Sequence, residues 1–200
     1  MNDMRERFSA AEESGAYLSL ISGNHDTPRI ADHLDERELR IFYLFLFALP
    51  GIPFLLYGDE LGMKTSDLPS KDGGYQRTGT RIPMIWDDSE PYHGFSKTEP
   101  YLPFSEENKV SLEQAVNDEN SLYHFLKKLI ALRKQIPDLR DPHLPIEEKD
   151  RIFRFERGGL DLIINLSKKT YPYQGEKIIA TEDFDADLPS GAAVLLKRRA

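Results

Sequence analysis

The sequence predicts an α/β fold, with a small all-β domain after it. Two short apolar runs, at about 17–21 and 52–57, have the length of strands, and the second is apolar throughout, as is typical of a parallel strand covered on both faces. Between them, residues 35–49 predict a helix with acidic residues in its first turn, where the helix dipole favours them. Pro50 and Gly51 end this helix. The order strand, helix, strand is typical of α/β barrels and open α/β sheets.

Polar residues follow both predicted strands at the point where the strands end. Asn24, His25 and Asp26 come after the first strand, and Asp59 and Glu60 come after the second. Binding sites in α/β folds lie outside the carboxyl ends of the parallel strands. The sequence therefore predicts a functional site formed by these two clusters.

The middle of the chain is predicted as a long loop and a helix. Residues 63–120 show little periodicity and are rich in glycine, proline and aromatic residues. A loop of this length inside a compact domain is usually functional or packed over a site. An amphipathic helix follows over 121–136, with leucines on one face and lysines on the other, and Pro137 ends it.

The last quarter of the chain changes from helical to alternating periodicity. The stretch RIFRFERGGLDLIINLS predicts two strands that turn at Gly158 and Gly159, and the runs KIIA and AAVLLK predict further strands. We therefore divide the chain into a first domain, 1–145, and a β-domain, 146–200, with the proline-rich residues 137–145 as the linker.

Composition and charge exclude several classes of function. The formal net charge of −8 argues against a nucleic-acid-binding protein, and the lack of cysteine excludes disulfides, thiolate metal sites and a cysteine nucleophile. The apolar stretch 41–58 is shorter than the ~20 residues of a membrane span, and Pro50, Gly51 and Pro53 interrupt it. Since the N-terminus has no apolar signal-peptide core, we expect a cytoplasmic protein that binds neither nucleic acid nor membrane.

The tetrapeptide GNHD at 23–26 allows two interpretations when it is taken alone. In metallophosphoesterases, the Asn and His of this tetrapeptide bind metal. A dinuclear site of that kind needs further Asp and His ligands before and after it. The residues before Gly23 contain no histidine and one aspartate, Asp3, and the later histidines form no H-x-H pair. A metal assay on purified protein tests this interpretation.

The longer pattern supports the other interpretation. NHD-x-P-R, a buried helix and then GIPFLLYGDELG resemble the last two β/α units of the α-amylase superfamily of glycoside hydrolases, family 13. Three further stretches are similar to one branch of this family, which contains α-glucosidases, oligo-1,6-glucosidases and trehalose-synthase-like enzymes. The stretches are RIPMIWDDSEPYHGF, YLPF and SLYHFLKKLIALRKQIPDLRD. LIINLS and LPSGAAVLLK extend the resemblance to the C-terminal domain. It implies the end of a TIM (β/α)8 barrel, a sandwich-like β-domain and an oligosaccharide substrate of the α-glucan class.

The resemblance also implies roles for individual residues. In this family a nucleophilic Asp and a Glu acid/base, ~5–5.5 Å apart, carry out retaining hydrolysis. A third carboxylate, at the end of the seventh strand, stabilises the oxocarbenium-like transition state. The resemblance makes Asp26 this third carboxylate, and it makes His25, Asn24, Arg29 and Arg81 substrate-binding residues. Arg29 is expected to pair with Asp26 or with a carboxylate outside this sequence.

The chain departs from the family pattern in three ways. The nucleophile and the acid/base belong to earlier strands than the two predicted here, so we expect the chain alone to be inactive. Ile82 and Ile85 stand where this branch has Thr and Gln, which leaves the substrate preference open. Calcium is common in relatives, but its ligands usually lie in loops outside this sequence, so no cofactor or metal is expected.

Two further expectations follow from these departures. A chain without the nucleophile and the acid/base is also consistent with a non-catalytic carbohydrate-binding or structural module. In addition, two β/α units cannot close a barrel, so one face and the edges of the predicted strands lack neighbours. Such edges favour self-association.

Overall fold

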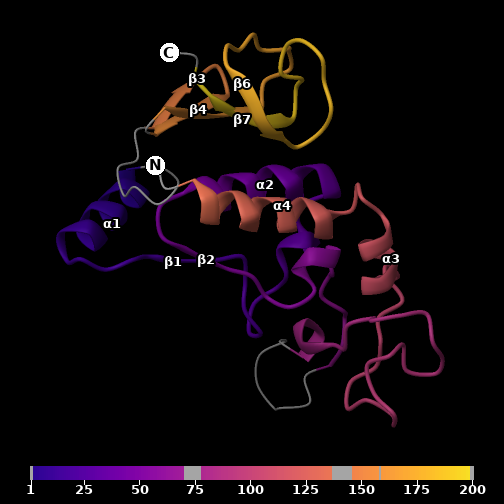
Figure 1. Ribbon diagram of the computed structural model, residues 1–200. Helices are drawn as coiled ribbons and strands as arrows, with labels where there is room; N and C mark the ends of the chain where they lie inside the picture. Colours follow the sequence, from indigo (N-terminus) through magenta and orange to yellow (C-terminus); the bar gives the residue numbers. More distant parts are fainter. Residues whose placement is uncertain (1, 70–77, 137–145, 158, 199–200) are drawn as a thin grey trace. The chain divides into compact units, whose positions relative to one another are not determined.

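The computed structural model describes residues 2–69, 78–136, 146–157 and 159–198 (Figure 1). The chain folds into two compact units. Unit 1 comprises Met1–Leu20, Arg40–Pro53 and Leu129–Ala200, and unit 2 comprises Ile21–Leu39 and Phe54–Lys128. The predicted linker, 137–145, lies outside the described residues, so the domain boundary predicted after it stays a prediction.

The first part of the chain alternates helices and strands, and its two strands pair in parallel. The elements are α1 (Asn2–Glu13), β1 (Ser19–Ile21), α2 (Glu36–Ala48) and β2 (Ile52–Phe54). The strands form a two-stranded sheet, in which Ile52 N donates to Leu18 O at 2.8 Å and Ser22 N donates to Phe54 O at 3.1 Å (Figure 1). Both strands advance in the same direction between these two bonds, so the pairing is parallel.

The ends of α2 follow from local chemistry. Glu38 N donates to Asp35 Oδ1 at 2.8 Å, and Asp35 N donates to Glu38 Oε2 at 2.9 Å, which together form a capping box. At the other end, Gly51 has φ +105°, and a Cβ there would lie 2.6 Å from Leu18 O. Only glycine therefore permits the turn that brings β2 alongside β1.

One face of the two-stranded sheet is open, as expected for two β/α units without neighbours on that face, although the apolar pattern of the second strand taken alone predicts the opposite. The apolar run at 52–57 predicts burial on both faces, but Ile52 and Phe54 are 47% and 50% exposed, and Ile21 is 54% exposed. None of the described segments packs over these side chains enough to bury them. Self-association through this face remains a prediction.

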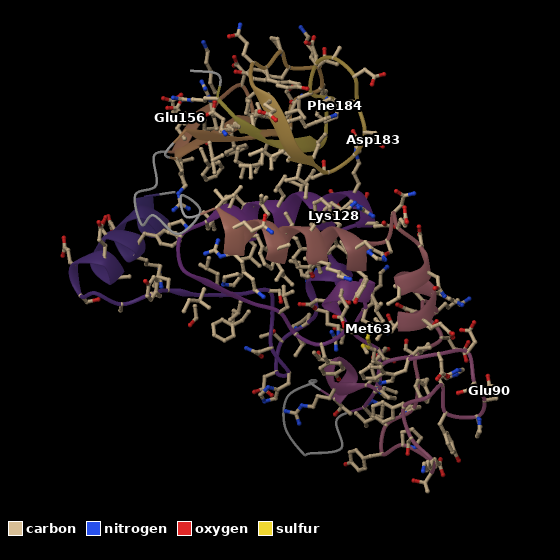
Figure 2. All side chains as sticks on the ribbon, in the orientation of Figure 1. Met63, Glu90, Lys128, Glu156, Asp183 and Phe184 are labelled. Atoms are coloured by element: carbon tan, nitrogen blue, oxygen red, sulfur yellow. The ribbon has the colours of Figure 1, made fainter. Side chains whose placement is uncertain are left out.

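The segment predicted as a long loop, 63–120, contains regular structure. It includes η3 (Thr78–Arg81) and α3 (Leu112–Asn117), and η2 (Asp59–Leu61) comes directly before it. A capping box between Ser111 and Gln114 starts α3, and this S-x-x-Q signal is present in the sequence. The segment also has a small core of buried residues, one of which, Met63, is labelled in Figure 2: Met63, Ile82 and Met84.

Helix α4 (Leu122–Gln135) follows, within one residue of the predicted bounds at each end. Ser121 Oγ accepts from His124 N at 3.3 Å and caps its first turn. Near the other end, the guanidinium of Arg133 donates to three backbone carbonyls, those of Phe47, Leu49 and Gly51. These include carbonyls at the C-terminal end of α2, which have no partners within that helix.

The C-terminal strands form one antiparallel sheet in the order β3-β4-β5-β7-β6. The strands are β3 (Ile146–Lys149), β4 (Ile152–Arg157), β5 (Leu160–Asn165), β6 (Glu176–Ala180) and β7 (Ala192–Lys197). Among the described residues there is no second sheet facing this one, so the sandwich-like arrangement is wrong for them. The hairpin between β4 and β5 pairs Arg157 with Leu160, and Gly158 lies outside the described residues.

Two non-strand layers cover the sheet instead. The ring of Phe155 in β4 packs edge-on against Phe45 of α2, with ring centroids 5.2 Å apart. On the other face, Leu188 belongs to a buried cluster with sheet residues, against which Phe184 packs; Phe184 is labelled in Figure 2. The central strand β5 is therefore buried along its whole length.

Asn165, at the end of β5, organises the turns beside the sheet. Its side chain is buried, and Oδ1 accepts from the backbone N of Ser167 at 3.0 Å. Its Nδ2 donates to three carbonyls, those of Lys169, Leu188 and Pro189, at 2.8–3.0 Å.

We expect Asn165→Asp to lower the free energy of unfolding by about 1–3 kcal/mol, because a carboxylate cannot donate to these carbonyls. Urea unfolding followed by circular dichroism measures this. The control is Gln174→Glu, the same change from amide to carboxylate at an exposed position outside helices and strands, which should change the free energy by less than about 0.5 kcal/mol. Equal effects of the two substitutions would contradict the role of Asn165.

Candidate active site

Strand β1 leads directly into the loop with the predicted site residues. Asn24 Oδ1 accepts from Asp26 N at 2.8 Å, and Asn24 O accepts from Thr27 N at 3.3 Å. These bonds close a tight turn of the kind that Asn favours. The amide oxygen of Asn24 thus shapes the turn that presents the two following side chains.

Three of the predicted site residues meet at this turn, where Arg81 of η3 contacts His25 and Asp26. Arg81 Nη2 donates to Asp26 Oδ1 at 2.7 Å, and Arg81 Nε donates to His25 O at 3.1 Å. His25 Nε2 lies 3.4 Å from Asp26 Oδ2. The side chains of His25 and Asp26 are 64% and 44% exposed, so a ligand in solution can reach the imidazole and the carboxylate.

Arg29 is buried, which does not suit the substrate-binding role predicted for it. Only 1% of its surface is exposed. Its Nη1 donates to Tyr57 O at 2.7 Å, and its Nη2 donates to Thr80 O at 2.9 Å. The guanidinium also lies over the Tyr57 ring, 4.9 Å from the centroid. The carboxylate beside it is that of Asp59, with Nη1 and Oδ1 3.7 Å apart, so the expected pairing with Asp26 is wrong.

Asp59 and Tyr57 hold the turn after β2. Asp59 accepts hydrogen bonds from Ser22 Oγ and, at 3.0 Å, from Leu56 N, so it ties the ends of both strands together. Burial raises the pKa of Asp59, against the lowering effect of these two donors and of Arg29. Tyr57 donates its hydroxyl to Ile82 O at 2.8 Å, and burial raises its pKa as well.

The segment that carries Arg81 is fixed by backbone contacts on both sides. Thr80 Oγ1 donates to Thr27 O at 2.9 Å, in the loop with Asp26. On the other side, Ser66 N donates to Gly79 O at 3.1 Å, and a Cβ on Gly79 would lie 1.7 Å from Ser66 O. The position of Arg81 therefore depends on a residue without a side chain two positions before it.

Sequence patterns did not indicate the contacts of Arg29, because its two closest acceptors are backbone carbonyls, which any residue could supply. The hydroxyl of Thr80 was missed for the same reason.

Among the described residues, no three His, Asp or Glu side chains lie close enough to hold a metal ion. No helix in the described ranges has the length and apolar character to cross a membrane.

Gly79→Ala is expected to displace η3, since the added methyl group collides with the Ser66 backbone. Overpacking of this kind costs about 1–3 kcal/mol. Thermal unfolding of the variant measures the loss, and Gly23→Ala is the control, because a Cβ there would make only ordinary contacts, at 3.7 Å from Pro28 O and from Thr27 Oγ1. A Gly79→Ala protein as stable as the wild type would show that Ser66 moves freely.

The raised pKa of Asp59 predicts a pH dependence of stability. A folded-state pKa above the unfolded value gives stability that is present below the unfolded pKa and lost as the pH rises through the folded pKa. Asp59→Asn removes this titration. We therefore expect the free energy of unfolding of the wild type, minus that of the variant, to be larger at about pH 4 than at about pH 7. Urea unfolding at both pH values measures the difference, and the opposite trend would contradict the burial effect.

The comparisons with known proteins agree with the motifs. The family model of the alpha-amylase catalytic domain matches residues 1–141. Oligo-1,6-glucosidase of Parageobacillus thermoglucosidasius is 30% identical over 200 residues, which are 79% of this chain and 35% of that protein. Alpha-glucosidase of Apis mellifera is 29% identical over 170 residues, 74% of this chain and 30% of that protein. The chain thus spans about a third of the length of these relatives.

Solved structures share the fold. Trehalose-6-phosphate hydrolase of Bacillus licheniformis superimposes with a TM-score of 0.77 at 20% identity, over 96% of this chain and 46% of that chain. A trehalulose synthase variant gives a TM-score of 0.80 at 18% identity, over 98% of this chain and 46% of that chain. Together with the match to residues 1–141, this shows that the chain belongs to the α-amylase family of glycoside hydrolases.

Proposed function

We propose that this chain supplies the carboxylate that stabilises the transition state in a retaining α-glucosidase-type glycoside hydrolase. The observation that carries the proposal is the arrangement at the end of β1, where Asp26 is exposed, bound by Arg81 and next to His25. Membership of the α-amylase family supports the same role for Asp26.

The chemistry of the three side chains suits this role. Oδ1 of Asp26 is held by Arg81 at 2.7 Å, which fixes the plane of the carboxylate before a sugar binds. The carboxylate accepts from sugar hydroxyls, and its charge is favourable beside a ring that becomes oxocarbenium-like. These interactions strengthen as positive charge develops, so they stabilise the transition state more than the ground state. His25 donates a further hydrogen bond to the same sugar.

The proposal includes the place of the chain in a complete barrel. β1 and β2 correspond to the seventh and eighth strands of a TIM (β/α)8 barrel, followed by a C-terminal β-domain. The parallel pairing of β1 with β2 and the helix between them support this assignment. The nucleophile and the acid/base then belong to strands outside these 200 residues, and the chain alone does not turn over a substrate.

Short α-glucans are the proposed substrates. The relatives that resemble the chain include an oligo-1,6-glucosidase, an α-glucosidase and a trehalose-6-phosphate hydrolase. Two of these names describe glucosidases and the third describes a hydrolase of trehalose 6-phosphate, so the relatives differ in their substrates. The proposal therefore covers α-glucosidic bonds as a class. Which α-glucosidic linkage is cut depends on contacts that the rest of the barrel supplies.

Asp26→Asn tests this function in the full-length product of the gene. With maltose, isomaltose and trehalose as substrates, kcat should fall by about 10²–10³-fold, because the amide carries no charge to stabilise the transition state. The matched control is Asp67→Asn, an exposed aspartate of the same unit, which should keep the wild-type rate. Circular dichroism checks that both variants are folded.

An Asp26→Asn enzyme that keeps most of its rate would remove Asp26 from the mechanism. A wild-type product that binds these sugars without turnover would instead favour the non-catalytic carbohydrate-binding module.

A further inference from the structure

Arg29 joins three segments that are far apart in the sequence. It stands in the loop after β1, and its guanidinium donates to Tyr57 O, in the turn after β2, and to Thr80 O, in η3. Its backbone N also donates, to Thr65 Oγ1 at 2.9 Å. No substrate in solution can reach this side chain, because it is 1% exposed. Any effect of Arg29 on catalysis must therefore pass through the segments that it holds.

One of these segments leads directly to Asp26. Thr80, whose carbonyl accepts from Arg29, precedes Arg81, whose guanidinium binds Asp26 Oδ1 and His25 O. Thr80 also donates through Oγ1 to Thr27 O, so the contact runs in both directions between η3 and the loop. These contacts thus form a closed ring. It runs through Arg29, Thr80, Arg81 and Asp26 and closes through the backbone of the loop.

The ring requires an arginine at position 29. Two carbonyls from different segments accept from two different nitrogens of one planar group, Nη1 and Nη2. A guanidinium has donors in a fixed fork, whereas a lysine has a single nitrogen that cannot reproduce this geometry. Two neighbours compensate the buried charge of Arg29. The Tyr57 ring lies beneath the guanidinium with its centroid at 4.9 Å, and the carboxylate of Asp59 lies 3.7 Å away.

We propose that Arg29 is a positioning residue for Asp26, acting through Thr80 and Arg81 to fix the direction of the Asp26 carboxylate without touching the substrate. The catalytic consequence rests on the proposed function of Asp26. Groups that act in a transition state must be held close to their productive geometry, and small displacements lower the rate sharply. A residue that holds Arg81 in place therefore controls kcat from inside the protein.

The first test uses the 200-residue chain and does not depend on activity. In Arg29→Lys, hydrogen exchange of the Arg81 Nε–H, which donates to His25 O in the wild type, should be about tenfold faster by NMR. The matched control is Arg133→Lys, because Arg133 also binds backbone carbonyls, but those of Leu49 and Gly51 between α2 and β2. Unchanged exchange in Arg29→Lys, or the same change in both variants, overturns the proposal.

A second variant keeps the test decisive if Arg29→Lys does not fold. Thr80→Val removes the hydroxyl that donates to Thr27 O and keeps the shape of the side chain. It should also speed exchange of the Arg81 Nε–H. Exchange at the wild-type rate overturns the proposed ring of contacts.

The second test measures coupling in the full-length product of the gene. Arg29→Lys should lower kcat by about 10–10²-fold with little change in KM, and it should cause no further loss when combined with Asp26→Asn. A purely structural role would give equal losses in both backgrounds, and that result overturns the proposal. Unchanged kcat in Asp26→Asn alone would overturn the proposed function instead, and the exchange result for Arg81 would be unaffected by it.

Discussion

The buried guanidinium of Arg29 holds the candidate site together. A buried charge is costly unless hydrogen-bond acceptors and an opposite charge surround it. This environment forms only when the loop after β1, the turn after β2 and η3 come together. The groups that provide it are Tyr57 O, Thr80 O and the carboxylate of Asp59. An arrangement that separates them leaves the charge without these partners. The same interaction that stabilises unit 2 therefore defines where Arg81 meets Asp26.

Arginines that bind backbone carbonyls recur in unit 1. Arg133 donates to Leu49 O at 2.9 Å, and Arg157 donates to Ala48 O at 2.7 Å. Both acceptors lie at the C-terminal end of α2, where the helix leaves carbonyls unsatisfied and the dipole favours a cation. Helix α4 and strand β4 are thus both tied to the end of α2. In each unit, the chain uses the planar fork of arginine to connect elements whose backbones would otherwise lack partners.

The two aspartates that follow the strands show how environment separates roles. Asp26 is 44% exposed and bound by Arg81, so its carboxylate is oriented and accessible. Asp59 is 3% exposed and binds Ser22 and Leu56, which commits it to holding the strand ends together. Burial raises the pKa of Asp59, as expected for a carboxylate removed from water. Chemically identical side chains, each just past a parallel strand, are thereby buried in one case and accessible to solvent in the other.

Local patterns in the sequence were sufficient to predict the family and the order strand, helix, strand in the first part of the chain. Apolar runs predicted β1 and β2, acidic residues predicted the start of α2, and the NHD-x-P-R motif indicated the family that the match to residues 1–141 shows. The partners of Arg29 and Arg81, in contrast, emerge only in the folded chain. Arg81 and Asp26 are 55 positions apart, and Arg29 binds carbonyls that carry no residue identity. The single sheet of the β-domain also required the folded chain, since the pattern of a single strand does not determine which segments pack together.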